Sequence, residues 1–129
     1  MRVVLTASNW LRGMAYGIGN EEPAMVWMDQ AMDGTFEGRR CCLGHACVAV
    51  GIDPERLKGH ITPHDITGIL ETPMSWCAVR KGHGVTPSTI QTDIAKINDN
   101  PDTSDEEKIA ELTPLFDEKG IELVWEPDK

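Results

Sequence analysis

Apolar residues recur every three or four positions in several stretches of the chain. That spacing places them on one face of a helix, so it predicts amphipathic helices. The clearest stretches cover residues 21–33, 42–50, 86–99 and 104–119, and a weaker one begins at Thr62–Pro63. We therefore expect four or five short helices.

The last of these helices has both of its ends marked in the sequence. Ser104 and Glu107, three residues apart, fit a capping box at its start, and Gly120 fits its end. Pro114 lies within the stretch and lacks the backbone N–H that a helix interior uses. A kink or an early end of the helix is expected there.

Two short stretches at opposite ends of the chain predict strands, residues 2–6 and 121–125. We expect them to pair antiparallel and so to tie the ends together. Residues 53–86 are rich in Pro, Gly and His, and we expect them to be irregular and loop-rich. The prediction is a helix-dominated α+β fold, with residues 1–129 in a single small domain.

The negative charge of the chain is concentrated in its C-terminal third. Net charge is −9 over 129 residues, and residues 93–129 hold 12 of the 21 acidic side chains with only four lysines. Such an acidic surface is poorly suited to the phosphates of duplex nucleic acid. It fits a solvated helix face, or a surface that attracts a basic partner.

No stretch of the sequence approaches the ~20 apolar residues that a membrane-spanning helix needs. The first ten residues contain an apolar run of three, which is too short for the core of a signal peptide. We therefore expect a cytoplasmic protein without a membrane partner. In that compartment its four cysteines should remain thiols.

Four short motifs follow one another along the chain. They are Trp27–Phe36 (WMDQAMDGTF), Arg40–Gly44 (RCCLG), Ile97–Asn100 (INDN) and Phe116–Ile121 (FDEKGI). In this order they resemble a group of small phage and prophage proteins, over residues 22–52 and 90–124. The resemblance implies a viral accessory protein that acts inside a bacterial host. It implies no particular chemistry, because the family has no assigned biochemical activity.

The cysteines and histidines offer candidates for a metal site. Cys41 and His45 are four residues apart and could share a helix face, with Cys77 and His83 as a second pair of ligands. The spacing matches no standard zinc module, and cysteines on the inner face of a helix are usually buried as small hydrophobic residues. We therefore expect no metal and no other cofactor.

A thiol nucleophile is a second interpretation of the same region. A cysteine at a helix N-terminus has its thiolate favoured by the helix dipole. Cys42 or Cys41 could act as the nucleophile, and His83 or His45 as the base. Asp99 or Asn98 could orient the base. No local signature of a cysteine enzyme family surrounds Cys42, so we do not expect an enzyme.

Polar residues near the start of this helix predict a ligand-binding site. Arg39 and Arg40 precede the helix N-terminus, where backbone N–H groups attract anions. His45, Asn98 and Asp99 could complete a pocket for a small polar ligand such as a nucleotide. The structural alternative is that Asn98 and Asp99 form a turn, and that the arginines pair with the acidic C-terminal third.

Together these features favour a non-enzymatic binding protein encoded by a phage or prophage. It would engage a host or defence component in the bacterial cytoplasm, either a protein surface or a small anionic signal molecule. One alternative is a cysteine-dependent hydrolase that uses Cys42. Another is a structural or regulatory phage protein that assembles with copies of itself.

Overall fold

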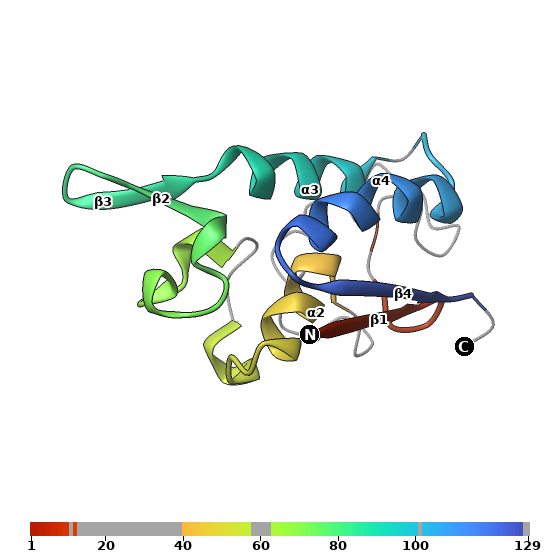
Figure 1. Ribbon diagram of the computed structural model, residues 1–129, viewed down its shortest axis with the longest axis horizontal. Helices are drawn as coiled ribbons and strands as arrows, with labels where there is room; N and C mark the ends of the chain where they lie inside the picture. Colours follow the sequence, from red (N-terminus) through yellow and green to blue (C-terminus); the bar gives the residue numbers. More distant parts are fainter. Residues whose placement is uncertain (11, 13–39, 58–62, 101, 128–129) are drawn as a thin grey trace, which may run out of the picture.

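The computed structural model describes residues 1–10, 12, 40–57, 63–100 and 102–127. Within them the chain forms three α-helices, four short 3₁₀ helices and two separate two-stranded sheets (Figure 1). The α-helices are α2 (Cys42–Ala49), α3 (Thr89–Asp99) and α4 (Asp105–Glu118). The strands are β1 (Arg2–Thr6), β2 (Ala78–Lys81), β3 (Gly84–Pro87) and β4 (Glu122–Glu126). The 3₁₀ helices are η2 (Pro54–Leu57), η3 (Pro63–Asp65), η4 (Ile69–Glu71) and η5 (Ser75–Cys77).

The expected number of helices is wrong for the part of the chain that the structure describes. The weaker helical stretch after residue 62 forms η3 and η4 instead of an α-helix. Gly68 between them has a φ of +77°, a left-handed conformation through which a right-handed helix does not continue. The helix expected over residues 21–33 lies outside the described residues.

The two terminal strands do pair, but in the parallel direction. The register runs from Arg2 opposite Glu122 to Thr6 opposite Glu126, so the predicted antiparallel pairing is wrong. The physical reason is that α4 packs against β4 and brings the chain back to the end of the sheet where β1 begins. There the N–H of Glu122 donates to the carbonyl of Met1 at 2.7 Å.

Helix α4 begins and ends as its sequence predicts. Ser104 Oγ accepts from the N–H of Glu107, and Glu107 Oε1 accepts from the N–H of Ser104, both at 3.1 Å. Gly120 follows the helix with a φ of +76°. The helix continues past Pro114 to Glu118, so the expected early end does not occur. Pro114 is exposed, and so is Ala110, whose carbonyl loses its helical partner.

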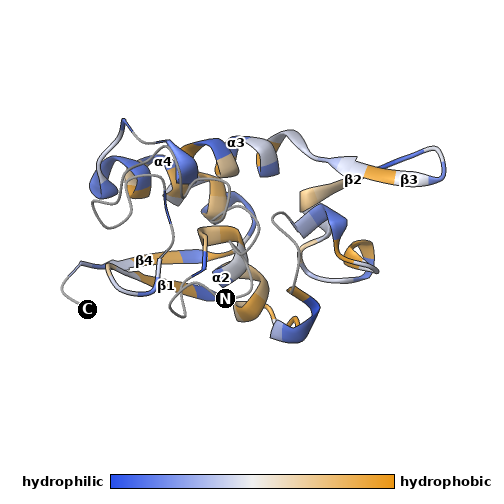
Figure 2. Cartoon of the chain, turned by 180° about the vertical axis from the view of Figure 1, so that it is seen from behind, coloured by the Kyte–Doolittle hydropathy of each residue, from blue (hydrophilic) through white to orange (hydrophobic). Residues whose placement is uncertain are grey.

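The core lies between the β1–β4 sheet and helices α2, α3 and α4, and Figure 2 shows α2 as largely hydrophobic. Trp10 is fully buried at its centre and packs edge-to-face against Trp125 of β4, with ring centroids 5.5 Å apart. The other fully buried large apolar side chains are Leu5, Leu43, Leu57, Ile69, Met74, Ile94, Leu112 and Phe116.

One buried amide joins three parts of this core. Asn98 Oδ1, on α3, accepts from Trp10 Nε1 at 2.7 Å and from the backbone N–H of Cys42 at 3.2 Å. Its Nδ2 donates to Asp99 Oδ1 at 2.9 Å. Asn98 is 2% exposed. The amide therefore ties the segment after β1, the first turn of α2 and the end of α3 to one another.

Two cationic side chains, Arg12 and Lys108, hold the start of α4 in place. Arg12 makes a two-pronged ion pair with Asp105, at 2.6 and 3.0 Å, and its guanidinium lies 5.0 Å from the centre of the Trp10 ring. Lys108 is fully buried, and its Nζ donates to the carbonyl and to Oγ1 of Thr103. Burial lowers the pKa of Lys108, while the nearby Asp105 carboxylate acts in the opposite direction.

Replacing Asn98 should destabilise the fold strongly. Asn98→Leu keeps the volume but leaves the Trp10 indole N–H and the Cys42 N–H buried without an acceptor. Each lost partner costs about 1–3 kcal/mol, so the free energy of unfolding should fall by roughly 2–6 kcal/mol in urea titration. Asn100→Ala is the control, because the Asn100 side chain accepts one exposed hydrogen bond, from the N–H of Asp102. A loss below about 1 kcal/mol in Asn98→Leu would contradict the role of the amide.

Candidate functional site

The structure gathers three of the residues expected to bind a ligand near the start of α2. His45 lies on α2, while Asn98 and Asp99 end α3. Their polar atoms are bonded within the protein: His45 Nε2 lies 2.7 Å from the carbonyl of Asn9, and Asn98 makes the bonds described above. Burial lowers the pKa of His45, which favours a neutral ring at this position.

The two arginines of the expected anion site have different outcomes. Arg40 forms an isolated parallel β-bridge with Trp10, in which its N–H donates to the carbonyl of Asn9 at 3.1 Å. Arg39 lies outside the described residues. A convergence of both guanidiniums on one anion therefore stays a prediction.

The residues expected for a cysteine hydrolase are not assembled as a triad in the structure. Cys42 is fully buried, and burial raises its pKa well above the ordinary value for a thiol. Asp99 lies close enough to Cys42 to raise that pKa further. His83 lies in the exposed turn between β2 and β3, and this hairpin extends away from α2 (Figure 1). A neutral, enclosed thiol is a poor nucleophile.

The four residues weighed as metal ligands also serve other roles or lie apart. Cys41 caps α2, with its Sγ accepting from the N–H of Gly44 at 3.4 Å. His45 contacts Asn9, Cys77 ends η5, and His83 is exposed. In the part of the chain that the structure describes, no three His, Cys, Asp or Glu side chains are grouped so that they could hold a metal ion.

All four cysteines should be unreactive in the folded protein. Each is buried as a free thiol, and burial raises the pKa of Cys41 and of Cys47 to about 12. Iodoacetamide at pH 7.5 should therefore modify the chain only as fast as it unfolds, and should modify all four sites in denaturant. Rapid alkylation of Cys41 or Cys42 in the native state, followed by mass spectrometry, would contradict this.

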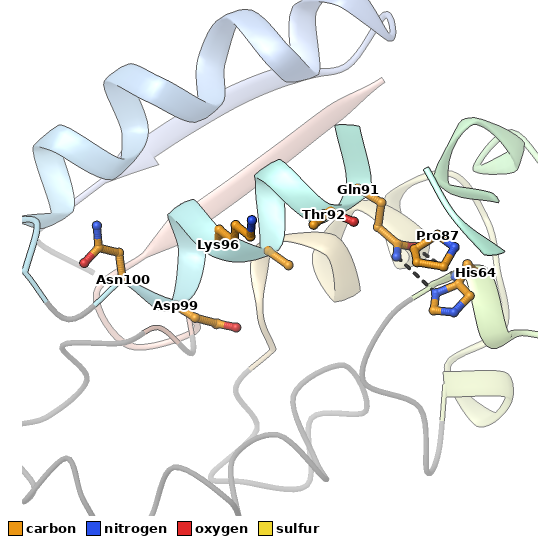
Figure 3. Close-up of a pocket in the computed structure, with 8 residues that line it drawn as sticks. His64, Pro87, Gln91, Thr92, Lys96, Asp99 and Asn100 are labelled. Atoms are coloured by element: carbon orange, nitrogen blue, oxygen red, sulfur yellow. Dashed lines mark hydrogen bonds between the residues drawn. The ribbon is translucent and has the colours of Figure 1, made fainter. Parts of the chain in front are cut away.

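A groove of about 490 Å³ runs along one side of α3 (Figure 3). It begins between His64 of η3 and Pro87 of β3 and ends at Asp99 and Asn100. Gln91, Thr92, Ala95 and Lys96 line it from the successive turns between. Because the 11 residues of α3 extend for roughly 16 Å, the groove is elongated. Its shape suits a linear ligand better than a compact one.

His64 is fixed at the end of the groove by Gln91. Gln91 Oε1 accepts from the backbone N–H of His64 at 2.9 Å, so the amide nitrogen must be the atom that lies 3.1 Å from His64 Nδ1. An amide nitrogen only donates, so Nδ1 accepts and the ring proton lies on Nε2, which faces Asp65 at 3.1 Å. With both nitrogens engaged, His64 shapes the groove and is not placed as a base.

Asp99 carries the titratable carboxylate at the other end of the groove. Part of the residue is exposed. Burial of its carboxylate by the surrounding protein nevertheless raises the pKa of Asp99 above the ordinary value for aspartate. The Asn98 amide and the charge of Lys108 act in the opposite direction and do not cancel this effect. Ionising Asp99 therefore costs more in the folded chain than in the unfolded one.

Because of this cost, the effect of Asp99→Asn on the stability of the fold should depend on pH. A folded-state pKa raised above 3.8 stabilises the fold below pH 3.8, and that contribution is lost as the pH rises through the folded-state pKa. Relative to the unmodified chain, Asp99→Asn should thus gain urea resistance between pH 3.5 and pH 7. Asp93→Asn, on an exposed position of the same helix, makes the same change of charge and serves as the control. A constant difference across this range would contradict the raised pKa.

The groove adjoins a structure that the sequence did not predict, an antiparallel hairpin of β2 and β3. We call residues 78–87 the arm, because Figure 1 shows the hairpin extending beyond the end of α3, away from the other elements. Its two-residue turn, Gly82–His83, has Gly82 at a φ of +62°. Val79 is 50% exposed and Val85 36% exposed, so both faces of the arm are open to solvent.

The charge of the arm is opposite to that of the rest of the chain. Residues 72–92 contain no Asp or Glu, while Arg80 and Lys81 give this window a net charge of +2 in a protein of net charge −9. Successive strand residues point to opposite faces. Arg80 therefore lies on one face with Val85, and Lys81 lies on the other face with Val79.

Apart from His83, which was weighed as a catalytic base and a metal ligand, the residues of the arm and the lysine of the groove were not among those expected to be functional. Gly82 and Gly84 on either side of His83, between β-branched residues, are a weak hairpin signal within a region expected to be loop-rich. The absence of acidic residues over residues 72–92 was the stronger signal.

Comparison of the chain with protein-family models, with characterised proteins and with solved structures finds no match. The resemblance to phage and prophage proteins therefore stays a prediction. Among the described residues, no helix is both long enough and apolar enough to cross a membrane.

Proposed function

We propose that this chain is a non-enzymatic binding protein that recognises a partner protein through the arm and the adjoining groove. The observation that carries the proposal is the arm itself, a basic hairpin with both faces exposed that extends from an acidic protein. Isolated two-stranded hairpins bury little apolar surface, so the contacts within the fold explain little of the arm's shape. A role outside the fold accounts for it.

A protein partner fits the arm better than a small anion does. Arg80 and Lys81 are adjacent in β2 and point to opposite faces, so the two charges cannot converge on one small ligand. They can both contact an extended partner that lies along the hairpin. Two cations would also neutralise only about two phosphates, which supports weak binding to duplex nucleic acid at most.

The groove adds contact area next to the arm. Pro87 belongs to both, since it ends β3 and lines the groove beside His64. A partner segment that leaves the arm at Pro87 can therefore continue along α3 past Lys96. The elongated groove and the hairpin together form one surface for a linear stretch of polypeptide.

The resemblance to phage and prophage proteins supports a bacterial host or defence component as the partner. On that basis we place the interaction in the bacterial cytoplasm.

Selection from a random peptide library tests this function directly. Twelve-residue peptides displayed on particles are selected on the immobilised protein, and the affinity of the enriched peptides is measured by fluorescence anisotropy. Reversing both charges of the arm, with Arg80→Glu and Lys81→Glu, should weaken binding by about tenfold, because each exposed ion pair contributes a few tenths to 1 kcal/mol and each reversal adds repulsion.

The matched control reverses two charges elsewhere. Arg2→Glu and Lys119→Glu change the net charge by the same amount, and neither residue belongs to the arm or lines the groove. This control should bind the enriched peptides as the unmodified chain does. Equal affinity of the enriched peptides for the arm variant and the control, or no enrichment at all, would contradict the proposed function.

A further inference from the structure

The arm has open backbone edges. Within the described residues its sheet has two strands, so each strand pairs on one side only. In a hairpin closed by a two-residue turn, the pair next to the turn exchanges both backbone hydrogen bonds, and here that pair is Lys81 and Gly84. The next pair, Arg80 and Val85, is then the non-hydrogen-bonded one. Its N–H and C=O groups point outward, where another strand can use them.

The edges of β2 and β3 differ in what lies beside them. Both cations of the arm belong to β2, and a strand added there would lie about 4.8 Å from it. A strand added to β3 would lie about twice as far from Arg80 and Lys81. The edge of β3 also ends at Pro87, which has no N–H to donate. The edge of β2 is therefore the better template for an acidic segment.

The side chains of β2 define what this segment should contain. Because Arg80 and Lys81 lie on opposite faces, two consecutive acidic residues of an added strand would each face one cation. Val79 and Val85 offer one exposed apolar contact on each face, which suits β-branched neighbours of the acidic pair. The complementary sequence is thus a pair of acids flanked by β-branched residues.

We propose that the open edge of β2 binds an extended acidic segment of the partner protein as a third strand of the arm. Backbone hydrogen bonds to Arg80 would hold the segment, and carboxylates facing Arg80 and Lys81 would select it. This proposal rests on the proposed function, and it specifies both the chemistry of the partner and its mode of binding.

The test uses a defined peptide, acetyl-Thr-Val-Glu-Glu-Val-Thr-amide, titrated into the full chain labelled with ¹⁵N. The amide resonances of Arg80 and Lys81 should shift, and the exchange of the Arg80 amide with solvent should slow. Two further peptides carry N-methyl groups at alternate residues, one set at odd and one at even positions. One of them should bind at least about tenfold more weakly than the parent, because its methyl groups block the edge that faces β2. The other should bind as the parent does.

The remaining outcomes each decide one point. If both methylated peptides bind as tightly as the parent peptide, side chains alone make the contact. That result would overturn the third strand and leave the proposed function standing. Equal binding of a peptide with Lys-Lys in place of Glu-Glu would overturn the acidic chemistry. Shifts of the Arg80 and Lys81 amides with protein concentration alone would identify a second copy as the occupant and overturn the partner segment.

Discussion

The hydrogen bonds of the Asn98 side chain are the interaction on which the rest of the structure depends. One carboxamide oxygen accepts from both the Trp10 indole and the Cys42 backbone, and so joins residues 88 and 56 positions away in sequence. Buried donors are costly to leave without an acceptor, so this oxygen determines where α2 begins relative to α3. The partly buried ion pair of Arg12 and Asp105 then holds α4 beside the same tryptophan.

This arrangement buries the cysteines, so the accessible polar groups lie elsewhere, along α3 and on the arm. Joining α2 to Asn98 encloses Cys41 and Cys42, so thiols that look reactive in the sequence act as buried packing groups. The side of α3 away from the core remains accessible and forms the groove. At the start of the same helix the chain leaves the core as the arm. The buried Asn98, which holds the fold, and the exposed Lys96 of the groove thus lie on different sides of α3.

Local signals in the sequence predicted the parts of the fold that depend on local interactions. The capping box of Ser104 and Glu107 and the strand at residues 2–6 are confirmed. The direction of pairing between β1 and β4 was not predictable, because it depends on how α4 packs against β4. The Asn98 contacts join distant residues and leave no local pattern. For the site, Asp99 was predicted as a ligand residue, whereas the arm was missed because four-residue strands carry little periodicity.

Asn98 holds a well-protected core, and the arm extends from this core without protection. Hydrogen exchange of the unliganded protein, followed residue by residue by NMR, tests this most directly. The Trp10 indole proton and the Cys42 amide should exchange only through global unfolding, and the Arg80 and Val85 amides should exchange orders of magnitude faster. An Arg80 amide protected as strongly as that of Cys42, or a Trp10 indole that exchanges as quickly as the arm, would contradict it.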